Sequence, residues 1–105
     1  MTALPPAAVL ALSATLLGVG IFGILTRRNF ILLLIAVEVA MNAAILNFVF
    51  FAAFSGTGAG LSGQSIAVVL VGLAATEVAV GLAIVLALNR LRGSINVAEA
   101  AQLKL

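Results

Sequence analysis

Residues 31–51 read ILLLIAVEVAMNAAILNFVFF, an apolar run that contains one carboxylate, Glu38, and two amides, Asn42 and Asn47. A helix over this run is about 30 Å long, which matches the hydrocarbon thickness of a bilayer. A charged residue in the middle of a membrane helix is costly and rare, and by default it marks a functional site. A second run, residues 66–88, repeats the arrangement with Glu77 at its centre. The two runs predict a protein that holds two glutamates inside a membrane.

The composition is that of an integral membrane protein. Of the 105 residues, 65% are hydrophobic and only 8% are charged, whereas a soluble domain carries roughly 25% charged residues. Cysteine and histidine are absent, which excludes disulfides, thiol chemistry and histidine-ligated metal or haem. Three carboxylates, Glu38, Glu77 and Glu99, are too few for a metal cage. Five cations are too few for a nucleic-acid interface, so we expect the lipid bilayer, and no nucleic acid, as a partner.

The hydropathy pattern predicts an all-α fold with three transmembrane helices in a single membrane domain, residues 1–105. We expect the helices at about residues 6–26, 29–54 and 64–91, followed by a tail at 94–105. The connection Arg27-Arg28-Asn29 is so short that the first two helices must be antiparallel neighbours. The glycine-rich stretch Ser55–Gln64 is interpreted as a loop. In the tail, Asn96 and Glu99 have the spacing of a capping box, which indicates a short surface helix.

The basic residues predict the orientation of the chain. With three spans, all five cations fall on one side of the membrane, and the Ser55–Gln64 loop on the other side carries none. The positive-inside rule then places the N-terminus outside and the C-terminus in the cytoplasm. We interpret Arg27 and Arg28 as orientation and interface residues; the alternative is that they help to bring protons to Glu38.

The two central glutamates are expected at similar depths. Glu38 lies nine residues, or ~14 Å, from Asn29 at the inner end, and Glu77 lies 13 residues, or ~20 Å, from Arg90. The difference of ~6 Å along the membrane normal describes a lateral arrangement. Hydrocarbon disfavours the ionised form of a carboxyl group, so such a group can take up and release protons in a relay. Protons that used both groups would step sideways in the plane of the membrane.

Other side chains near the glutamates are candidates for support. Asn42 lies four residues after Glu38 on the same helix face and can hydrogen-bond it or an adjacent water, whereas Asn47 faces a different neighbour. Small residues form one stripe on the first helix and another on the third, and such stripes let other helices approach closely. We therefore infer a subunit of a larger complex. The stripes consist of Ala7, Ala11, Ala14 and Gly18, and of Gly72, Ala75, Ala79 and Ala83.

Two blocks of this sequence resemble a known family. The block Thr26-Arg27-Arg28-Asn29, followed by Ile35-x-x-Glu38-x-x-Met41-Asn42-Ala43, resembles the second-helix signature of the small three-helix membrane subunit of respiratory complex I, the NuoK type. The block Ala74-Ala75-Thr76-Glu77-Val78-Ala79-Val80-Gly81-Leu82-Ala83-Ile84 resembles its third-helix pattern. The family usually has alanine at the position of Thr76. The resemblance covers residues 12–93.

This resemblance implies a subunit of a proton-translocating NADH:quinone oxidoreductase (complex I, NDH-1) of the respiratory electron transport chain, a translocase in the bacterial inner membrane or an organellar energy-transducing membrane. It implies that the chain itself binds no cofactor, and that NAD, FMN, Fe–S clusters and quinone belong to other subunits. The expected partners are other membrane-arm subunits, including small neighbours and antiporter-like subunits. Glu38 and Glu77 would be the buried glutamates of the axis that couples quinone reduction to proton translocation.

Several other functions compete with this interpretation. An equivalent subunit of a ferredoxin-linked, hydrogenase or cation/proton antiporter complex would contain the same module. A small multidrug-type proton antiporter would have four spans and aromatic residues around a cation site, and this chain has neither Trp nor Tyr. A rotor proteolipid would have two helices and one carboxylate. A purely structural role would make each glutamate a protonated hydrogen-bond donor that fixes helix packing.

Overall fold

The computed structural model describes residues 4–54, 60–93 and 95–101, and for Gly60, Leu61 and Glu99 it describes the backbone alone. The chain forms α1 (Pro6–Thr26), α2 (Phe30–Phe54), α3 (Gly60–Arg92) and the short α4 (Val97–Ala100). The first three helices are each long and apolar enough to cross a membrane. Apart from one bridge between Asn29 and Asn96, the described residues contain no β-structure. The predicted all-α class with three spans is therefore confirmed.

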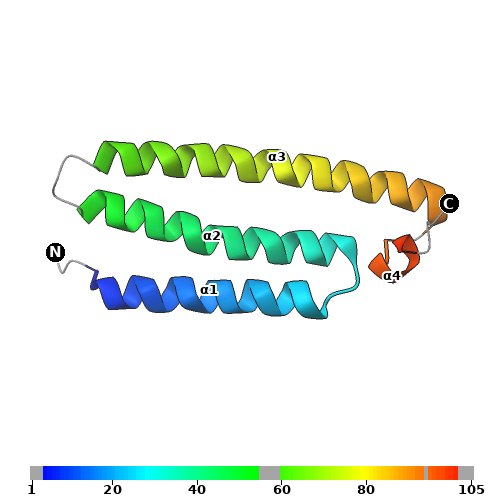
Figure 1. Cartoon of the computed structure of the whole chain (residues 1–105), viewed down its shortest axis with the longest axis horizontal. Coiled ribbons are helices and arrows are strands. Elements are labelled where there is room, and N and C mark those ends of the chain that lie inside the picture. Colours follow the sequence, from blue (N-terminus) through cyan, green and yellow to red (C-terminus); the bar gives the residue numbers. More distant parts are fainter. Residues whose placement is uncertain (1–3, 55–59, 94, 102–105) are drawn as a thin grey trace.

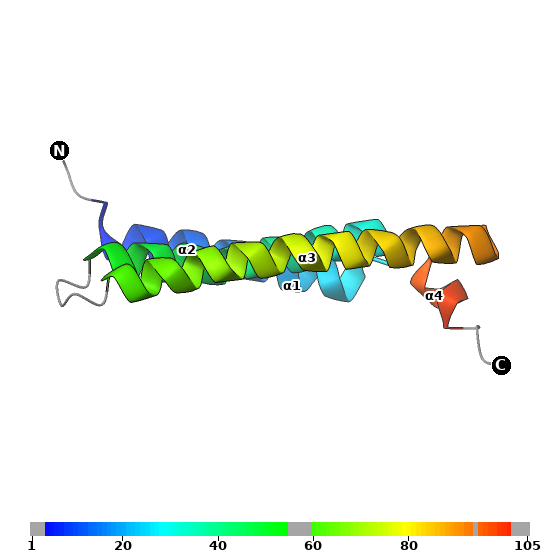
Figure 2. The same cartoon turned by 90° about the horizontal axis from the view of Figure 1, so that it is seen from above.

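The three long helices form a single antiparallel layer with α2 in the middle (Figure 1). They overlap in projection when the molecule is turned by 90° (Figure 2). The close helix contacts run from α1 to α2 and from α2 to α3. The helix α2 therefore has a neighbour on each side, whereas α1 and α3 each leave a long apolar surface uncovered.

Helix α3 begins at Gly60, four residues before its expected start at Gln64. Glycine is a poor helix former, so the sequence pattern indicated a loop here. In the structure Gly63 lies against Ala52 of α2, and a Cβ atom at this position would collide with the Ala52 side chain. Close packing against α2 thus stabilises the additional turn. Residues 55–59 of the expected loop, and the tail cation Lys104, lie outside the described residues.

The interface between α1 and α2 is formed by a face of α1 other than the stripe of small residues seen in its sequence. Val9, Ser13 and Gly20 are buried against α2, and a Cβ atom on Gly20 would lie 2.7 Å from the backbone nitrogen of Ala40. The expected stripe, Ala7 to Gly18, is exposed, and no atom lies within 4 Å of a Cβ atom built on Gly18. The stripe is therefore not the contact with α2.

Helix α3 shows the same pattern. Its buried residues Ala67, Ala74 and Val85, together with Gly63 and Gly81, follow the helical repeat along the side that faces α2. The second expected stripe is exposed along its whole length, and open space surrounds Gly72. Both stripes thus lie on outer surfaces of the layer.

At the end where α1 meets α2, the tail is joined to the connection between the helices. The backbone N–H of Phe30 donates to the carbonyl of Ile95 (3.0 Å), and that of Val97 donates to the carbonyl of Arg28 (2.7 Å). These two bonds form the bridge between Asn29 and Asn96. The turn that brings the tail back begins at Gly93, whose φ of 66° is the left-handed conformation favoured by a helix C-terminal glycine.

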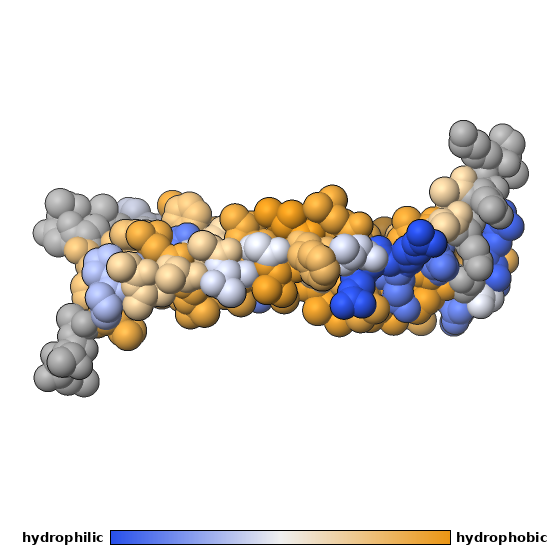
Figure 3. All heavy atoms as spheres, turned by 90° about the horizontal axis from the view of Figure 1, so that it is seen from below, coloured by the Kyte–Doolittle hydropathy of each residue, from blue (hydrophilic) through white to orange (hydrophobic). Residues whose placement is uncertain are grey.

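Two asparagine side chains cap the helices beside this bridge. The Oδ1 atom of Asn29 accepts the N–H of Ile31 (2.9 Å) at the start of α2, and the Oδ1 atom of Asn96 accepts the N–H of Ala98 (2.9 Å) at the start of α4. The predicted capping role of Asn96 and the short helix after it are confirmed, while the Glu99 side chain lies outside the described atoms. In Figure 3 the strongly hydrophilic atoms gather at this end of the molecule, next to a mainly apolar surface.

Candidate functional site

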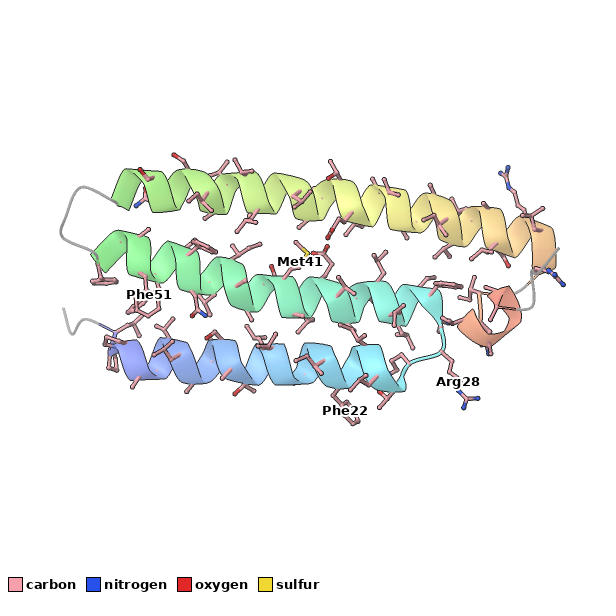
Figure 4. All side chains as sticks on the ribbon, viewed as in Figure 1. Phe22, Arg28, Met41 and Phe51 are labelled. Carbon is pink, nitrogen blue, oxygen red and sulfur yellow. The ribbon has the colours of Figure 1, made fainter. Side chains whose placement is uncertain are left out.

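Glu38 lies on the side of α2 that faces α3. Leu34, four residues earlier, contacts α3, because a Cβ atom on Gly81 would lie 2.8 Å from its Cδ1 atom. Met41, three residues after Glu38, extends between α2 and α3 in Figure 4. Residues at positions i, i+4 and i+7 share one face of a helix. Glu38 is therefore placed at the α2–α3 interface.

Glu77 of α3 lies at the same level as Glu38. Glu38 is four residues after Leu34, and Glu77 is four residues before Gly81. Because the two helices are antiparallel and rise equally per residue, the Leu34–Gly81 contact sets both glutamates at one height. The contact between Ala52 and Gly63 agrees with this register, since these residues lie 14 positions after Glu38 and 14 before Glu77.

The expected depth difference of ~6 Å between the glutamates is absent, and the reason is the length of α3. Nine residues from Glu77 toward the basic end, the position level with Asn29 is Leu86. Arg90 lies four residues, or ~6 Å, further along the helix, and α3 extends past the end of α2 (Figure 1). Asn29 and Arg90 therefore do not mark the same depth. The two glutamates therefore lie closer to one depth than their distances from Asn29 and Arg90 indicate.

The environments of the two carboxyl groups differ. Glu38 is half-buried, and its Oε1 atom is enclosed without a hydrogen-bond partner among the described residues. Glu77 is exposed on the layer surface, where it lines a hollow of about 320 Å³ with Thr76, Val80, Gly81 and Ile84. Gly81 thus belongs both to this hollow and to the contact with Leu34. The hollow borders the interface in which Glu38 lies.

The two asparagines lie in different places. Asn42 is exposed and makes no hydrogen bond to Glu38 within the described structure. Asn47 has the helical phase of Ala36, Ala40 and Ala43, so it faces α1. Its Oδ1 atom is buried and has no partner among the described residues. The prediction that Asn47 faces a different neighbour from Glu38 is confirmed.

Sequence reasoning missed Ser13, the one polar side chain found fully buried in the described part of the chain, at 4% exposure. Ser13 lies seven residues before Gly20 on α1, and Asn47 lies seven residues after Ala40 on α2, so they share a level at the α1–α2 interface. The Ser13 hydroxyl donates to the carbonyl of Leu10 (3.0 Å). A lone serine in an apolar helix has no sequence signal that distinguishes this position from an ordinary backbone-bonded hydroxyl. The pair becomes visible only through the helix register.

The arginines lie at one end of the layer. Arg27 and Arg28 are exposed in the connection between α1 and α2, and Arg90 and Arg92 are exposed in the last turn of α3. Thr76 next to Glu77 donates its hydroxyl proton to the carbonyl of Leu73 (2.7 Å), so it is bonded within its own helix. The structure therefore brings Glu38 and Glu77 to one level and leaves the basic pair Arg27 and Arg28 apart from them.

Comparison with known proteins identifies the family. Residues 8–105 match the family described as NADH-ubiquinone/plastoquinone oxidoreductase chain 4L. The chain is 49% identical over 88 residues to NADH-quinone oxidoreductase subunit K of Anaeromyxobacter sp. strain K, covering 84% of this chain and 86% of the relative. It is 42% identical over 104 residues to subunit K of Bacillus anthracis, covering 99% of both chains. This chain belongs to the chain 4L family.

Membership in the chain 4L family confirms the resemblance seen in the two sequence blocks. The matched residues include α1 from residue 8 onward, all of α2 and α3, and both central glutamates. The agreement over almost the full length of the Bacillus anthracis subunit also includes the tail, onto which the sequence blocks carried nothing.

Proposed function

We propose that this chain is a non-redox membrane-arm subunit of a proton-translocating NADH:quinone oxidoreductase and that Glu38 and Glu77 pass protons laterally within it. Family membership supports the first part of the proposal. The observation that carries the second part is the register of α2 on α3, which sets the two carboxyl groups at one level. Two carboxyl groups that lie at one depth, and that can both bind and release a proton, can pass a proton from one to the other across the helix interface.

The unpaired Oε1 atom of Glu38 supports a role beyond packing. A glutamate that only fixed helix packing would need a hydrogen-bond partner inside the chain, because a buried polar group without one is costly. No described residue supplies a partner to this oxygen. We propose that water or a neighbouring subunit supplies it, and either would connect Glu38 to a proton path.

The exposure of Glu77 supports a neighbouring subunit beside the edge of the α2–α3 interface, where the Glu77 hollow lies. An ionisable side chain within a membrane span almost always faces a protein interior or a water-filled cavity, and Glu77 faces neither within this chain. We propose that a second membrane-arm subunit covers the Glu77 hollow and continues the path.

The proposal includes an orientation and a location. The exposed arginines at one end of the layer fit a cytoplasmic face for the α1–α2 connection and α4. In a bacterium the chain would lie in the inner membrane with its N-terminus outside. NAD, FMN, Fe–S clusters and quinone would be bound by other subunits, and Asn42 and Asn47 would support proton transfer by binding water.

Purification of the tagged chain in a mild detergent tests the assembly. The proposal predicts a large complex with NADH:quinone reductase activity. A monomer or dimer that exports cationic drugs would contradict it. A large complex that oxidises ferredoxin or hydrogen would show that the electron donor is not NADH. The proton-transfer role would then be measured in that complex.

Single Glu38→Gln and Glu77→Gln variants test the proton-transfer role, because glutamine keeps the size and hydrogen bonding of glutamate but cannot exchange a proton. Each variant should assemble normally and lose proton pumping by at least about tenfold. The matched control is Glu99→Gln, which removes the third carboxylate from α4, outside the spans. Equal pumping by all three variants would exclude the relay and favour a packing role.

A further inference from the structure

We propose that the connection between α1 and α2, together with the tail, forms a binding site for the phosphate group of an anionic phospholipid. A pocket of about 370 Å³ lies between these two segments. Its lining combines polar and cationic residues with two apolar side chains: Thr26, Arg27, Arg28, Asn29, Asn96, Leu32 and Ile95. Neither Glu38 nor Glu77 is among the lining residues, so this pocket is separate from the glutamates.

The pocket is built by the fold. The two backbone hydrogen bonds between the tail and the connection hold Ile95 and Asn96 opposite Arg28 and Asn29. The Oδ1 atom of Asn29 is occupied by the backbone N–H groups of α2, which leaves its NH₂ group as a donor. Docking of the tail therefore forms an open pocket, lined by amide and guanidinium donors, at the end of the membrane spans.

The charge of the pocket selects an anion. Arg27 and Arg28 contribute two guanidinium groups, and no carboxylate is among the lining residues that the structure describes. Neither arginine forms an ion pair with a carboxylate in the described part of the chain. Guanidinium groups bind phosphate oxygens in a bidentate way. An unpaired pair of arginines beside a polar pocket therefore fits a phosphate group.

The apolar surface beside the pocket favours a phospholipid over a soluble compound as the source of that phosphate. Phe22 and Leu25 of α1 are 62% and 78% exposed, within the two turns that precede the pocket. The side chains of Phe22 and Arg28 extend to the same side of the layer, away from α2 and α3 (Figure 4). A phospholipid can place its phosphate on the arginines and an acyl chain along this apolar surface. Basic pockets at the ends of membrane helices bind anionic headgroups in this manner.

Photocrosslinking tests the site in the intact complex. The purified complex is placed in bilayers of phosphatidylcholine that contain a small fraction of phosphatidylglycerol with a photoreactive acyl chain, and the labelled residues are mapped by mass spectrometry. We expect labels on residues 22–28. A phosphatidylcholine probe with the same acyl chain should label this segment at least about tenfold less. Equal labelling by the two wild-type probes would overturn the proposal without any variant.

Variants locate the charge requirement. The double variant R27Q/R28Q should reduce phosphatidylglycerol labelling of residues 22–28 by about tenfold or more. R27K/R28K keeps the charge but loses the bidentate geometry, so its labelling should lie between those of R27Q/R28Q and the wild type. The control R90Q/R92Q removes the same charge at the same end of the layer but outside the pocket, and should label as the wild type does. Equal reduction by both glutamine pairs would mean that general surface charge, and no site, attracts the lipid.

Competition separates the lipid from a soluble phosphate compound. Inorganic phosphate at millimolar concentration should leave the labelling unchanged, because it lacks the acyl chain that lies along Phe22 and Leu25. Loss of labelling in phosphate would show that the pocket takes a soluble anion, and would overturn the lipid assignment. Absence of any label on residues 22–28 would show that a partner protein covers this surface, and would also overturn the lipid assignment.

Discussion

Leu34 of α2 lies directly against Gly81 of α3, and this contact sets the register that brings Glu38 level with Glu77. A chain without cysteine allows a direct test of the contact. The double variant L34C/G81C should form a disulfide upon mild oxidation, because the Cγ atom of Leu34, where a cysteine carries its sulfur, lies 3.5 Å from a Cβ atom built on Gly81. Electrophoresis without reductant measures it as a faster-migrating band.

The control for this prediction is L34C/G72C. Gly72 lies on the same helix, but no atom lies within 4 Å of a Cβ atom built there. This pair should remain reduced within the chain under the same conditions. Equal intramolecular crosslinking of the two pairs would contradict the register, and with it the common level of the glutamates.

Gly20 and Gly18 form a matched pair for testing the α1–α2 contact. Gly20→Ala would place a Cβ atom against the backbone of Ala36 and Ala40, at 2.9 Å from one carbonyl oxygen, so the helices must separate. We expect a loss of about 1–3 kcal/mol from overpacking, seen as a lower midpoint of thermal unfolding in detergent. Gly18→Ala meets open space and should be neutral, or stabilising by up to about 1 kcal/mol. Identical midpoints would mean that α2 packs on another face of α1.

A substitution of Asn47, whose Oδ1 atom is buried, tests its contribution to stability and its contribution to function separately. Replacing a buried polar group that has no partner by an apolar group of similar size is close to neutral. Asn47→Leu should therefore leave thermal unfolding nearly unchanged. If Asn47 supports proton transfer through a bound water, the same variant should lower the pumping rate. A large loss of stability would instead show that the amide has a partner in the assembled complex.

The existence of the three spans, and the bounds of the first two to within one residue, could be predicted from the sequence because they depend on hydropathy. The caps at Gly93 and Asn96 were also predictable, since each depends on a local conformational preference. The start of α3 was not predictable, because the glycines there favour a loop, whereas Gly63 lies within the helix and against Ala52 of α2. Local propensity could not reveal that contact.

The packing faces could not be predicted because each span is apolar on all sides and has small residues at several phases. Gly18 and Gly20 are two residues apart, yet one faces open space and the other α2. The depth of Glu38 and Glu77 in their spans singled them out in the sequence, but their common level follows only from the register of α2 against α3. The common level of Ser13 and Asn47 follows in the same way from the register of α1 against α2. The tail bridge joins residues 67 positions apart, Asn29 and Asn96, through backbone groups that carry no sequence signal.

The most direct test of the central claim is proton pumping by the Glu38→Gln/Glu77→Gln double variant beside the two single variants. The initial rate of acidification is measured in inverted membrane vesicles supplied with NADH. Residues that act as a unit have non-additive effects. The account predicts that each single variant loses at least about tenfold, and that the double variant is no slower than the slower single variant. A double variant that pumps at the wild-type rate would contradict it.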